Sequence, residues 1–510
     1  MSGQGGDTTL ALISDLIGAL ADDGIRYCHW KSTSSLSVAL AGKTDLDLLV
    51  DRSDATRFAA TVAGLGFKRF ISHPSRQLPG VDDWLGLDRG SRRIVHLHVY
   101  HELVLGEELV KNHRLPVEEV LLRHTRLLHG MPVPTPELEL AVLAVRALLK
   151  YREDAYLRDL VGFGHRGGLP AGISEEVADL LGQTTPEAVG EAVERHLPML
   201  PASVIVAFLR VAVSRPIDAG RVRALRHELE RALRPYARRG ELALLPLRAQ
   251  AAVSRSRLVR GVRRVGERVR GRPSGRRKRP AAGGRVVAVI GIDGAGKSTV
   301  VDALVETYAW RVNVATLYLG SARPGIATAA TQAATRIARR ASSWLGRRLD
   351  ERNPLTRAAG AVTDVAFGVR ALAEATERAR RVRLGRRLAA DGWLVVFDRY
   401  PMPNLRVGER RMDASRLPAT ERGAGWVSGR LARRERAIYR GIPEPELVIA
   451  LRLDAETARA RKPSAPIALE AKAEALAALG DGDETLVVID AAAPLEEVLR
   501  RATAAVWERL

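Results

Sequence analysis

Residues 285–299 have the sequence RVVAVIGIDGAGKST, an apolar run that leads into a glycine-rich turn. Residues 291–298 match the pattern G-x-x-x-x-G-K-[ST] at every position. The apolar run predicts a buried strand, and a helix is expected to begin near Lys297. Glycines let backbone N–H groups turn around phosphate oxygens without a Cβ clash, and a helix N-terminus adds positive charge. This stretch therefore predicts a strand, a phosphate-binding loop and a helix in succession.

The lysine and the serine of this loop have separate expected roles. Lys297 is expected to reach the β- and γ-phosphates of a nucleotide, and Ser298 to ligate Mg²⁺. Only nine of the 80 basic residues are lysines, which suits Lys297 to a role that needs a compact point charge. The expected nucleotide-binding residues are Gly291, Asp293, Gly294, Ala295, Gly296, Lys297, Ser298 and Thr299.

The chain after Pro280 alternates short apolar runs with long helical patterns. The apolar runs lie at 285–291, 312–319, 393–397, 447–453 and 485–489. Strands that alternate with helices predict a parallel sheet between helices.

Two motifs in this half, GIDGAGKST at 291–299 and LVVFDRY at 394–400, resemble the thymidylate kinases, a family of P-loop nucleoside-monophosphate kinases. The resemblance covers residues 285–510 and includes GRRLAADGW at 385–393 and a segment at 442–462. It implies a P-loop kinase fold, ATP and Mg²⁺ as cofactors, and a phosphorylated small molecule, most simply a nucleoside monophosphate, as acceptor.

The resemblance also implies roles for single residues. Asp398 would hold Mg²⁺, Arg399 would bind the phosphate of the acceptor, and Asp293 would approach the acceptor sugar. Arg459 and Arg461, with Lys462, fall where the family has a mobile lid and would neutralise charge on the transferring phosphoryl group. The implied catalytic residues are Lys297, Asp398, Arg399, Arg459 and Arg461, and the implied metal ligands of this half are Ser298 and Asp398.

The chain departs from the family pattern around the expected acceptor site. Ile290 stands where the family usually has an acidic residue, and LYLGSARPGI at 317–326 replaces a Glu-Pro-Gly-Gly segment. PMPNLRVGERRM at 401–412 replaces small polar residues and an aromatic that enclose thymine. Thymidylate is therefore a poor candidate for the acceptor.

The N-terminal part contains a second motif, YCHWKS at 27–32 followed by GKTDLDLLV at 42–50. Alternation in a strand places Asp45 and Asp47 on one face, where two carboxylates can share Mg²⁺ ions that hold a nucleoside triphosphate. The motif resembles polymerase-β-type nucleotidyltransferases, which implies an α+β fold with Asp45 and Asp47 as metal ligands.

This second motif departs from its family in two ways. Trp30-Lys31-Ser32 replaces the expected Gly-Ser element, and the strand RIVHLHVY carries His96 and His98 where a third acid is expected. Imidazole is a poor Mg²⁺ ligand, so we expect this domain to have the fold without the activity.

The remaining N-terminal sequence predicts mixed elements. Helices are expected at 9–21, 55–65, 136–151 and 197–213, a strand at 44–51, and a hairpin that joins 84–88 to 93–100. The expected domains are a nucleotidyltransferase-like α+β domain at 1–112, a helical domain at 113–250, a basic linker at 251–283 and a P-loop domain at 284–510.

Composition limits the class of protein. At 510 residues the chain is too long for one core. Its mean hydropathy is -0.08, and no apolar run reaches the ~18 residues that are needed to span a bilayer. Cys28 is the only cysteine, which excludes an internal disulfide. We expect a cytoplasmic protein without a transmembrane segment, and a homodimer is compatible with the sequence.

The net charge of +21 is concentrated in one segment. Residues 251–280 hold twelve basic residues and one acid. We interpret them as a solvated linker, with weak contact to a polyanion as the alternative.

Two other functions stay open at this stage. The chain could be a bifunctional enzyme whose N-terminal half transfers a nucleotidyl group. It could also be a nucleotide-dependent binding module or switch without kinase activity.

Overall fold

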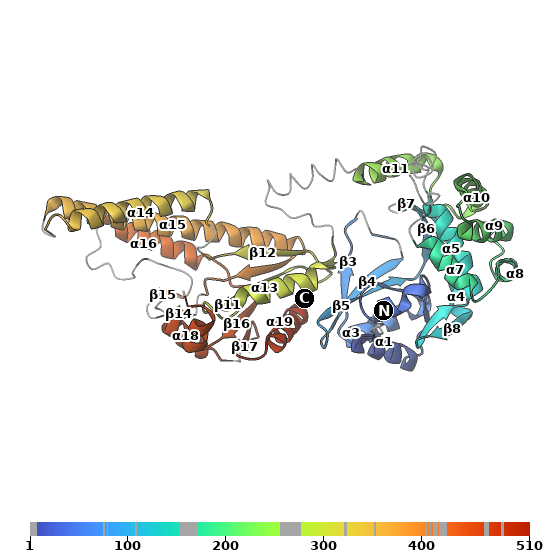
Figure 1. The fold of residues 1–510 in the computed structure, drawn as a ribbon, viewed down its shortest axis with the longest axis horizontal. Coiled ribbons are helices and arrows are strands. Elements are labelled where there is room, and N and C mark those ends of the chain that lie inside the picture. Colours follow the sequence, from blue (N-terminus) through green and yellow to red (C-terminus); the bar gives the residue numbers. More distant parts are fainter. Residues whose placement is uncertain are drawn as a thin grey trace. The chain divides into compact units, whose positions relative to one another are not determined.

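The computed structural model describes residues 8–510 apart from 75–76, 79, 108–109, 152–168, 170–171, 256–276, 321–323, 351–352, 403–404, 408–409, 412–416, 418–425, 464–468 and 481–483. The chain forms two compact units, unit 1 (Met1–Lys278) and unit 2 (Arg279–Leu510). Figure 1 colours unit 1 from blue to green and unit 2 from yellow to red. Most of the basic segment predicted as a linker, and part of the 401–412 segment, lie outside the described residues.

A mixed sheet organises unit 1. Its strands lie side by side in the order β1 (Tyr27–His29), β2 (Leu46–Val50), β5 (Arg93–Tyr100), β4 (Val81–Asp88) and β3 (Lys68–Ile71). β2 and β5 are parallel, and the other neighbours are antiparallel. The predicted hairpin between β4 and β5 is confirmed, although β4 begins three residues earlier than expected.

Each side of this sheet packs against its own core. Leu46, Leu48 and Val50 join a core with helices α1 (Ala11–Asp22) and α3 (Ala55–Gly64). Alternation turns Leu49 the other way, into a core built mainly by helices. That second core includes residues on both sides of position 112, such as Cys28 and Leu143. The division of the chain into four domains stays a prediction.

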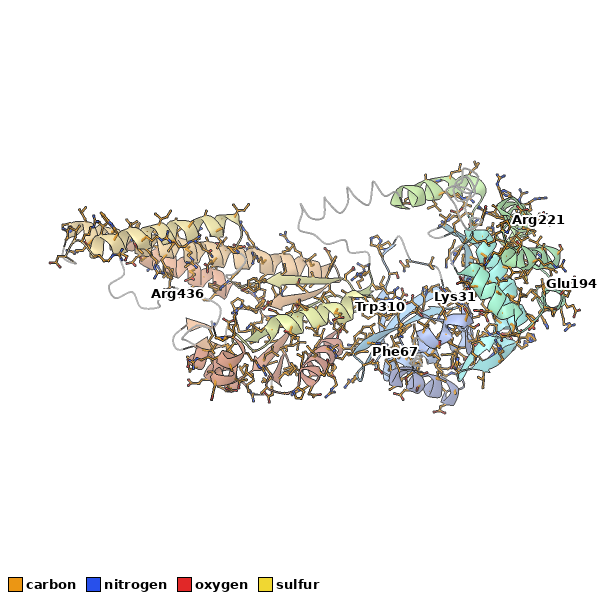
Figure 2. All side chains as sticks on the ribbon, in the orientation of Figure 1. Lys31, Phe67, Glu194, Arg221, Trp310 and Arg436 are labelled. Atoms are coloured by element: carbon orange, nitrogen blue, oxygen red, sulfur yellow. The ribbon has the colours of Figure 1, made fainter. Side chains whose placement is uncertain are left out.

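The second core is built on an array of helices. They are α4 (Glu118–Arg123), α5 (Pro136–Lys150), α7 (Ile173–Leu181), α8 (Pro186–His196), α9 (Ala202–Val213) and α10 (Ala219–Ala232). The next helix, α11 (Glu241–Arg255), lies outside this core, and α2 (Leu36–Leu40) belongs to the other core. Apolar faces point inward, whereas charged side chains such as Glu194 and Arg221 face solvent (Figure 2).

The region predicted as helical from residue 113 also contains strands, and a hairpin begins shortly before it. Hairpins form between β6 (Leu103–Glu107) and β7 (Val110–Leu115), and between β8 (Thr125–Leu128) and β9 (Met131–Pro134). His129 and Gly130 both have positive φ, the conformation that a two-residue hairpin turn of type I′ requires. Between residue 113 and the start of α5, the helical prediction therefore holds for α4 and is wrong for the end of β7 and for β8 and β9.

Unit 2 contains the predicted parallel sheet. The strand order is β12 (Val314–Tyr318), β13 (Leu394–Asp398), β11 (Arg285–Gly291), β16 (Leu447–Arg452) and β17 (Leu486–Asp490), and every neighbouring pair is parallel. Each strand lies within two residues of its predicted bounds. The prediction of a mixed α/β protein with a parallel sheet is confirmed.

Helices connect the strands of unit 2. They are α13 (Lys297–Ala309), α14 (Ile326–Gly346), α15 (Pro354–Ala390), α16 (Trp426–Arg440), α17 (Ala455–Arg461), α18 (Leu469–Ala477) and α19 (Leu495–Arg509), with the short strands β10 (Arg279–Pro280), β14 (Arg406–Val407) and β15 (Arg410–Arg411). Helix α14 and the first part of α15 extend away from the sheet of unit 2 as an antiparallel pair (Figure 1). Within the described parts of the chain, no helix is long and apolar enough to span a membrane.

Candidate functional site

The glycine-rich loop lies at the carboxyl end of the central strand of unit 2. β11 is buried between β13 and β16, and α13 begins at Lys297, where the sequence predicted a helix. Backbone N–H groups of the first turn of α13 therefore face the loop. The predicted binding residues divide into the end of β11 (Gly291), the loop (Asp293, Gly294, Ala295, Gly296) and the first turn of α13 (Lys297, Ser298, Thr299).

Two glycines in the loop are required by its geometry. Gly294 and Gly296 have φ values of 96° and 84°, in the left-handed region that favours glycine. A Cβ on Gly294 would lie 2.6 Å from the carbonyl oxygen of Ala458 on α17. The loop can approach the backbone of α17 only because residue 294 has no side chain.

Lys297 folds back onto this loop. Its side chain is 7% exposed, and its ammonium donates a hydrogen bond of 2.7 Å to the carbonyl oxygen of Ile292. The same ammonium lies 3.6 Å from the carboxylate of Asp293. A buried positive charge is thus placed inside the loop segment.

Arg399 reaches the loop from the next strand. It follows β13, donates its backbone N–H to the carbonyl oxygen of Val289, and pairs its guanidinium with Asp293. Its φ of 72° is a left-handed value that costs a non-glycine residue free energy, which is common at functional positions. Burial alone raises the pKa of Asp293, but Arg399 and Lys297 outweigh it and hold the pKa below its usual value.

Ser298 and Asp398 lie on the same edge of the sheet. The Ser298 hydroxyl donates to Asp398 Oδ2 over 3.5 Å, because β13 is the direct neighbour of β11. A hydroxyl and a carboxylate are the oxygen ligands that Mg²⁺ prefers, and Mg²⁺ usually takes few protein ligands and completes its shell with water and phosphate. This pair therefore fits a magnesium ion.

The two expected lid arginines do not contact these groups. Arg459 pairs with Glu470 of α18, and Arg461 donates 2.9 Å to the carbonyl oxygen of Ala491. Lys462, at the end of α17, contributes to the lowered pKa of Asp293. Among the three basic residues expected in the lid, Lys462 is therefore the one whose charge acts on the loop carboxylate of Asp293.

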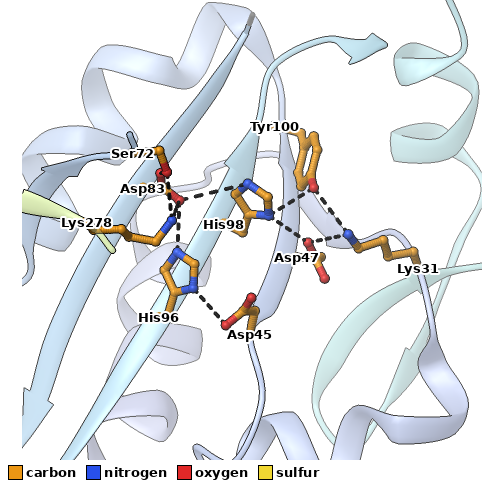
Figure 3. A network of polar contacts seen from close by, with 9 residues as sticks. All are labelled: Lys31, Asp45, Asp47, Ser72, Asp83, His96, His98, Tyr100 and Lys278. Carbon is orange, nitrogen blue, oxygen red and sulfur yellow. Dashed lines mark hydrogen bonds and ion pairs between the residues drawn. The ribbon is translucent and has the colours of Figure 1, made fainter. Parts of the chain in front are cut away.

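Unit 1 contains a separate polar cluster across β2, β5 and β4 (Figure 3). Asp45 contacts His96 at 2.7 Å, and the other ring nitrogen of His96 contacts Asp83 at 2.9 Å. Asp47 contacts His98 at 3.2 Å. Alternation has placed both aspartates on the side of the sheet that carries the two histidines, as the sequence predicted.

Two lysines complete this polar cluster. Lys31 lies 2.6 Å from Asp47 and 3.2 Å from the hydroxyl of Tyr100, and Lys278 lies 2.7 Å from Asp83. Burial raises the pKa of Asp47 and of Asp83, but the contacts with lysine and histidine outweigh it, so both pKa values lie well below the usual range.

The predicted magnesium site at Asp45 and Asp47 does not fit these contacts. An ammonium already supplies the positive charge beside Asp47, and Asp45 is bound to an imidazole. Within the ranges that the structure describes, no group of three or more His, Cys, Asp or Glu side chains is placed to hold a metal ion.

Sequence reasoning missed Asp83. The predicted strand began at Trp84, whereas β4 begins at Val81 and pairs Asp83 with His98. If the antiparallel pairing is continued along both strands away from the turn at 89–92, Asp83 falls opposite His98.

Comparisons with known proteins point in one direction. No family model matches the chain. The protein named uncharacterized ATP-binding protein YghR, from Escherichia coli strain K12, is 33% identical over 236 residues, which cover 43% of this chain and 86% of YghR. The protein named uncharacterized ATP-binding protein YghS, from the same strain, is 28% identical over 235 residues, covering 44% of this chain and 94% of YghS. The chain belongs to the family of YghR.

Proposed function

We propose that the chain binds ATP and transfers its γ-phosphoryl group, with Mg²⁺, to a phosphorylated small molecule such as a nucleoside monophosphate. The observation that carries this proposal is the gathering of Lys297, Ser298, Asp398 and Arg399 around one loop at the end of β11. The name of YghR as an ATP-binding protein supports the nucleotide part of the proposal.

The donor side of the reaction would use the loop and α13. Loop N–H groups and Lys297 would bind the phosphates of ATP, exchanging the Ile292 carbonyl for phosphate oxygens. Ser298 and Asp398 would hold Mg²⁺. When bound, Mg²⁺ supplies charge neutralisation on the phosphates.

The acceptor side would use Arg399. Its guanidinium offers a fork of N–H donors that matches phosphate oxygens, and Asp293 orients that fork. The backbone N–H of Arg399 is hydrogen-bonded to the Val289 carbonyl, which holds the strained backbone in place. The position of the Cα from which the side chain extends is therefore fixed. Catalysis would consist of positioning and charge neutralisation.

Acceptor-stimulated ADP release tests the proposal. Release from ATP is measured with Mg²⁺ or with EDTA, against a panel of nucleoside monophosphates and other phosphate monoesters. We expect stimulation by one acceptor class and its loss in EDTA. Tight ATP binding without stimulation by any acceptor would reject the kinase and favour a nucleotide-dependent switch.

Replacement of Lys462 should lower the rate of acceptor-stimulated ADP release more than replacement of a lid arginine. Lys462→Gln should lower acceptor-stimulated ADP release about tenfold, or ~1.4 kcal/mol of transition-state stabilisation, because this cation acts on the loop. Arg461→Gln is the matched control and should retain the rate, since Arg461 is bound to the Ala491 carbonyl. An equal loss in both variants would mean that α17 rearranges to bring the arginines in.

A further inference from the structure

Three cations in unit 1 surround two buried aromatic rings. Lys31 Nζ lies 5.3 Å from the ring centre of Trp30 and 5.2 Å from that of Tyr100. Lys111 Nζ lies 5.9 Å from the Tyr100 ring, and Arg146 Cζ lies 5.4 Å from the Trp30 ring. We call Lys31, Lys111 and Arg146 the cationic cluster; its members come from the segment after β1, from β7 and from α5.

Carboxylates do not balance this cationic cluster. Asp47 pairs with Lys31. In the parts of the chain that the structure describes, Lys111 and Arg146 contact aromatic faces but have no ion pair with a carboxylate. Burial, and then the charges of Lys31 and Lys150, lower the pKa of Lys111 to about 7. Repulsion between neighbouring cations raises the free energy of the folded protein, and attraction to a bound anion would offset that cost.

A buried donor lies in the same place. The indole N–H of Trp30, a residue only 2% exposed, has no hydrogen-bond partner among the described residues. Trp30 packs edge-on against Tyr100, with ring centres 5.0 Å apart. The site therefore combines surplus positive charge with an unsatisfied N–H donor, and both favour an anionic ligand.

Lysine use points to the same region. Three of the nine lysines of this arginine-rich chain, Lys31, Lys111 and Lys150, lie in the cationic cluster or beside it, and a fourth, Lys278, lies in the polar cluster of the same unit. Lys31 and Lys278 place ammonium groups against Asp47 and Asp83, the carboxylates that a divalent ion would otherwise use.

We propose that unit 1 binds a phosphorylated ligand at Lys31, Lys111 and Arg146 without a divalent metal ion. Two cations without a carboxylate partner call for a ligand with about two negative charges, which a phosphate group carries near neutral pH. Ammonium and guanidinium groups both form charge-assisted hydrogen bonds to phosphate oxygens. This site is independent of the nucleotide site proposed for unit 2.

Titration calorimetry with pyrophosphate tests this site. The 510-residue chain carries Lys297→Ala, which removes the main phosphate contact proposed for unit 2, and the buffer contains EDTA. Pyrophosphate should bind, and Lys111→Gln should weaken that binding tenfold or more, about the loss of one charge-assisted hydrogen bond. Arg210→Gln is the matched control, because Arg210 is a 63% exposed cation of the same unit paired with Glu187, and it should leave the affinity unchanged.

Thermal unfolding separates ligand binding from a structural role. Lys111→Gln should unfold at the same temperature as the parent or higher, because it removes a half-buried cation that its neighbours repel. Three results would each overturn the proposal: no binding of pyrophosphate in EDTA, binding that requires Mg²⁺, or equal affinity in Lys111→Gln and its parent.

Discussion

Lys297→Ala should lower acceptor-stimulated ADP release by about 10²- to 10³-fold, the cost of removing one preorganised charge from a developing phosphoryl transition state. The ammonium is 7% exposed and already lies against the loop carbonyl of Ile292, so it needs little reorganisation to meet a phosphate. Steady-state ADP release over a range of ATP concentrations, together with ATP affinity by calorimetry, measures the effect on turnover and on binding separately.

A second lysine of unit 2 provides the control. Lys472→Ala removes an ammonium from α18 and should leave ADP release unchanged. Both variants should unfold like the parent, because the ion pair between Asp293 and Arg399 remains. Turnover that survives in Lys297→Ala would remove the loop lysine from the proposed mechanism.

Asp47→Asn should destabilise unit 1 by about 3 kcal/mol. The carboxylate is 14% exposed, balances the charge of Lys31 and contacts His98, and its removal leaves the largely buried charge of Lys31 uncompensated. Hydrogen exchange of peptides from β2 and β5 reports the loss within unit 1. Asp82→Asn is the control: its side chain is 32% exposed and pairs with Arg69, so it should cost under about 1 kcal/mol.

The effect of Asp47→Asn should depend on pH in one direction. The pKa of Asp47 is lowered in the folded protein, so its contribution is fully present above the unfolded pKa of about 3.9 and declines as the pH falls below it. The difference between Asp47→Asn and its parent should therefore shrink in acid. A difference that stays constant down to pH 2 would contradict the assigned ion pair.

The architecture of unit 2 could be predicted because its signals are local. The apolar run before the loop and the glycines at 294 and 296 specify a strand, a turn and a helix without reference to distant residues. The resemblance to P-loop kinases implied a place for Asp398 beside the loop, and the parallel pairing of β13 with β11 brings it next to Ser298.

Side-chain partners across long separations could not be predicted in the same way. Lys278 meets Asp83 through nearly two hundred residues of intervening chain, and no pattern in the sequence indicates that pairing. Arg459 and Arg461 lie on α17, where a mobile lid was expected, but Glu470 and the Ala491 carbonyl compete for their guanidinium groups. The direction of a long side chain depends on such competition between partners.

The lowered pKa of Lys111 also makes it a reactive amine. With a pKa of about 7, part of its side chains carry no proton near neutral pH, whereas a lysine with an ordinary pKa near 10.4 is almost fully protonated. Only the unprotonated amine attacks an electrophile, and burial lowers the pKa of Lys31 as well. A mild acylating reagent therefore distinguishes Lys111 and Lys31 by chemistry from lysines with an ordinary pKa. An anion bound beside Lys111 would raise the pKa of its amine, which would then be protonated and lose its nucleophilicity. The reactivity of this side chain would therefore report whether the proposed site of unit 1 is occupied.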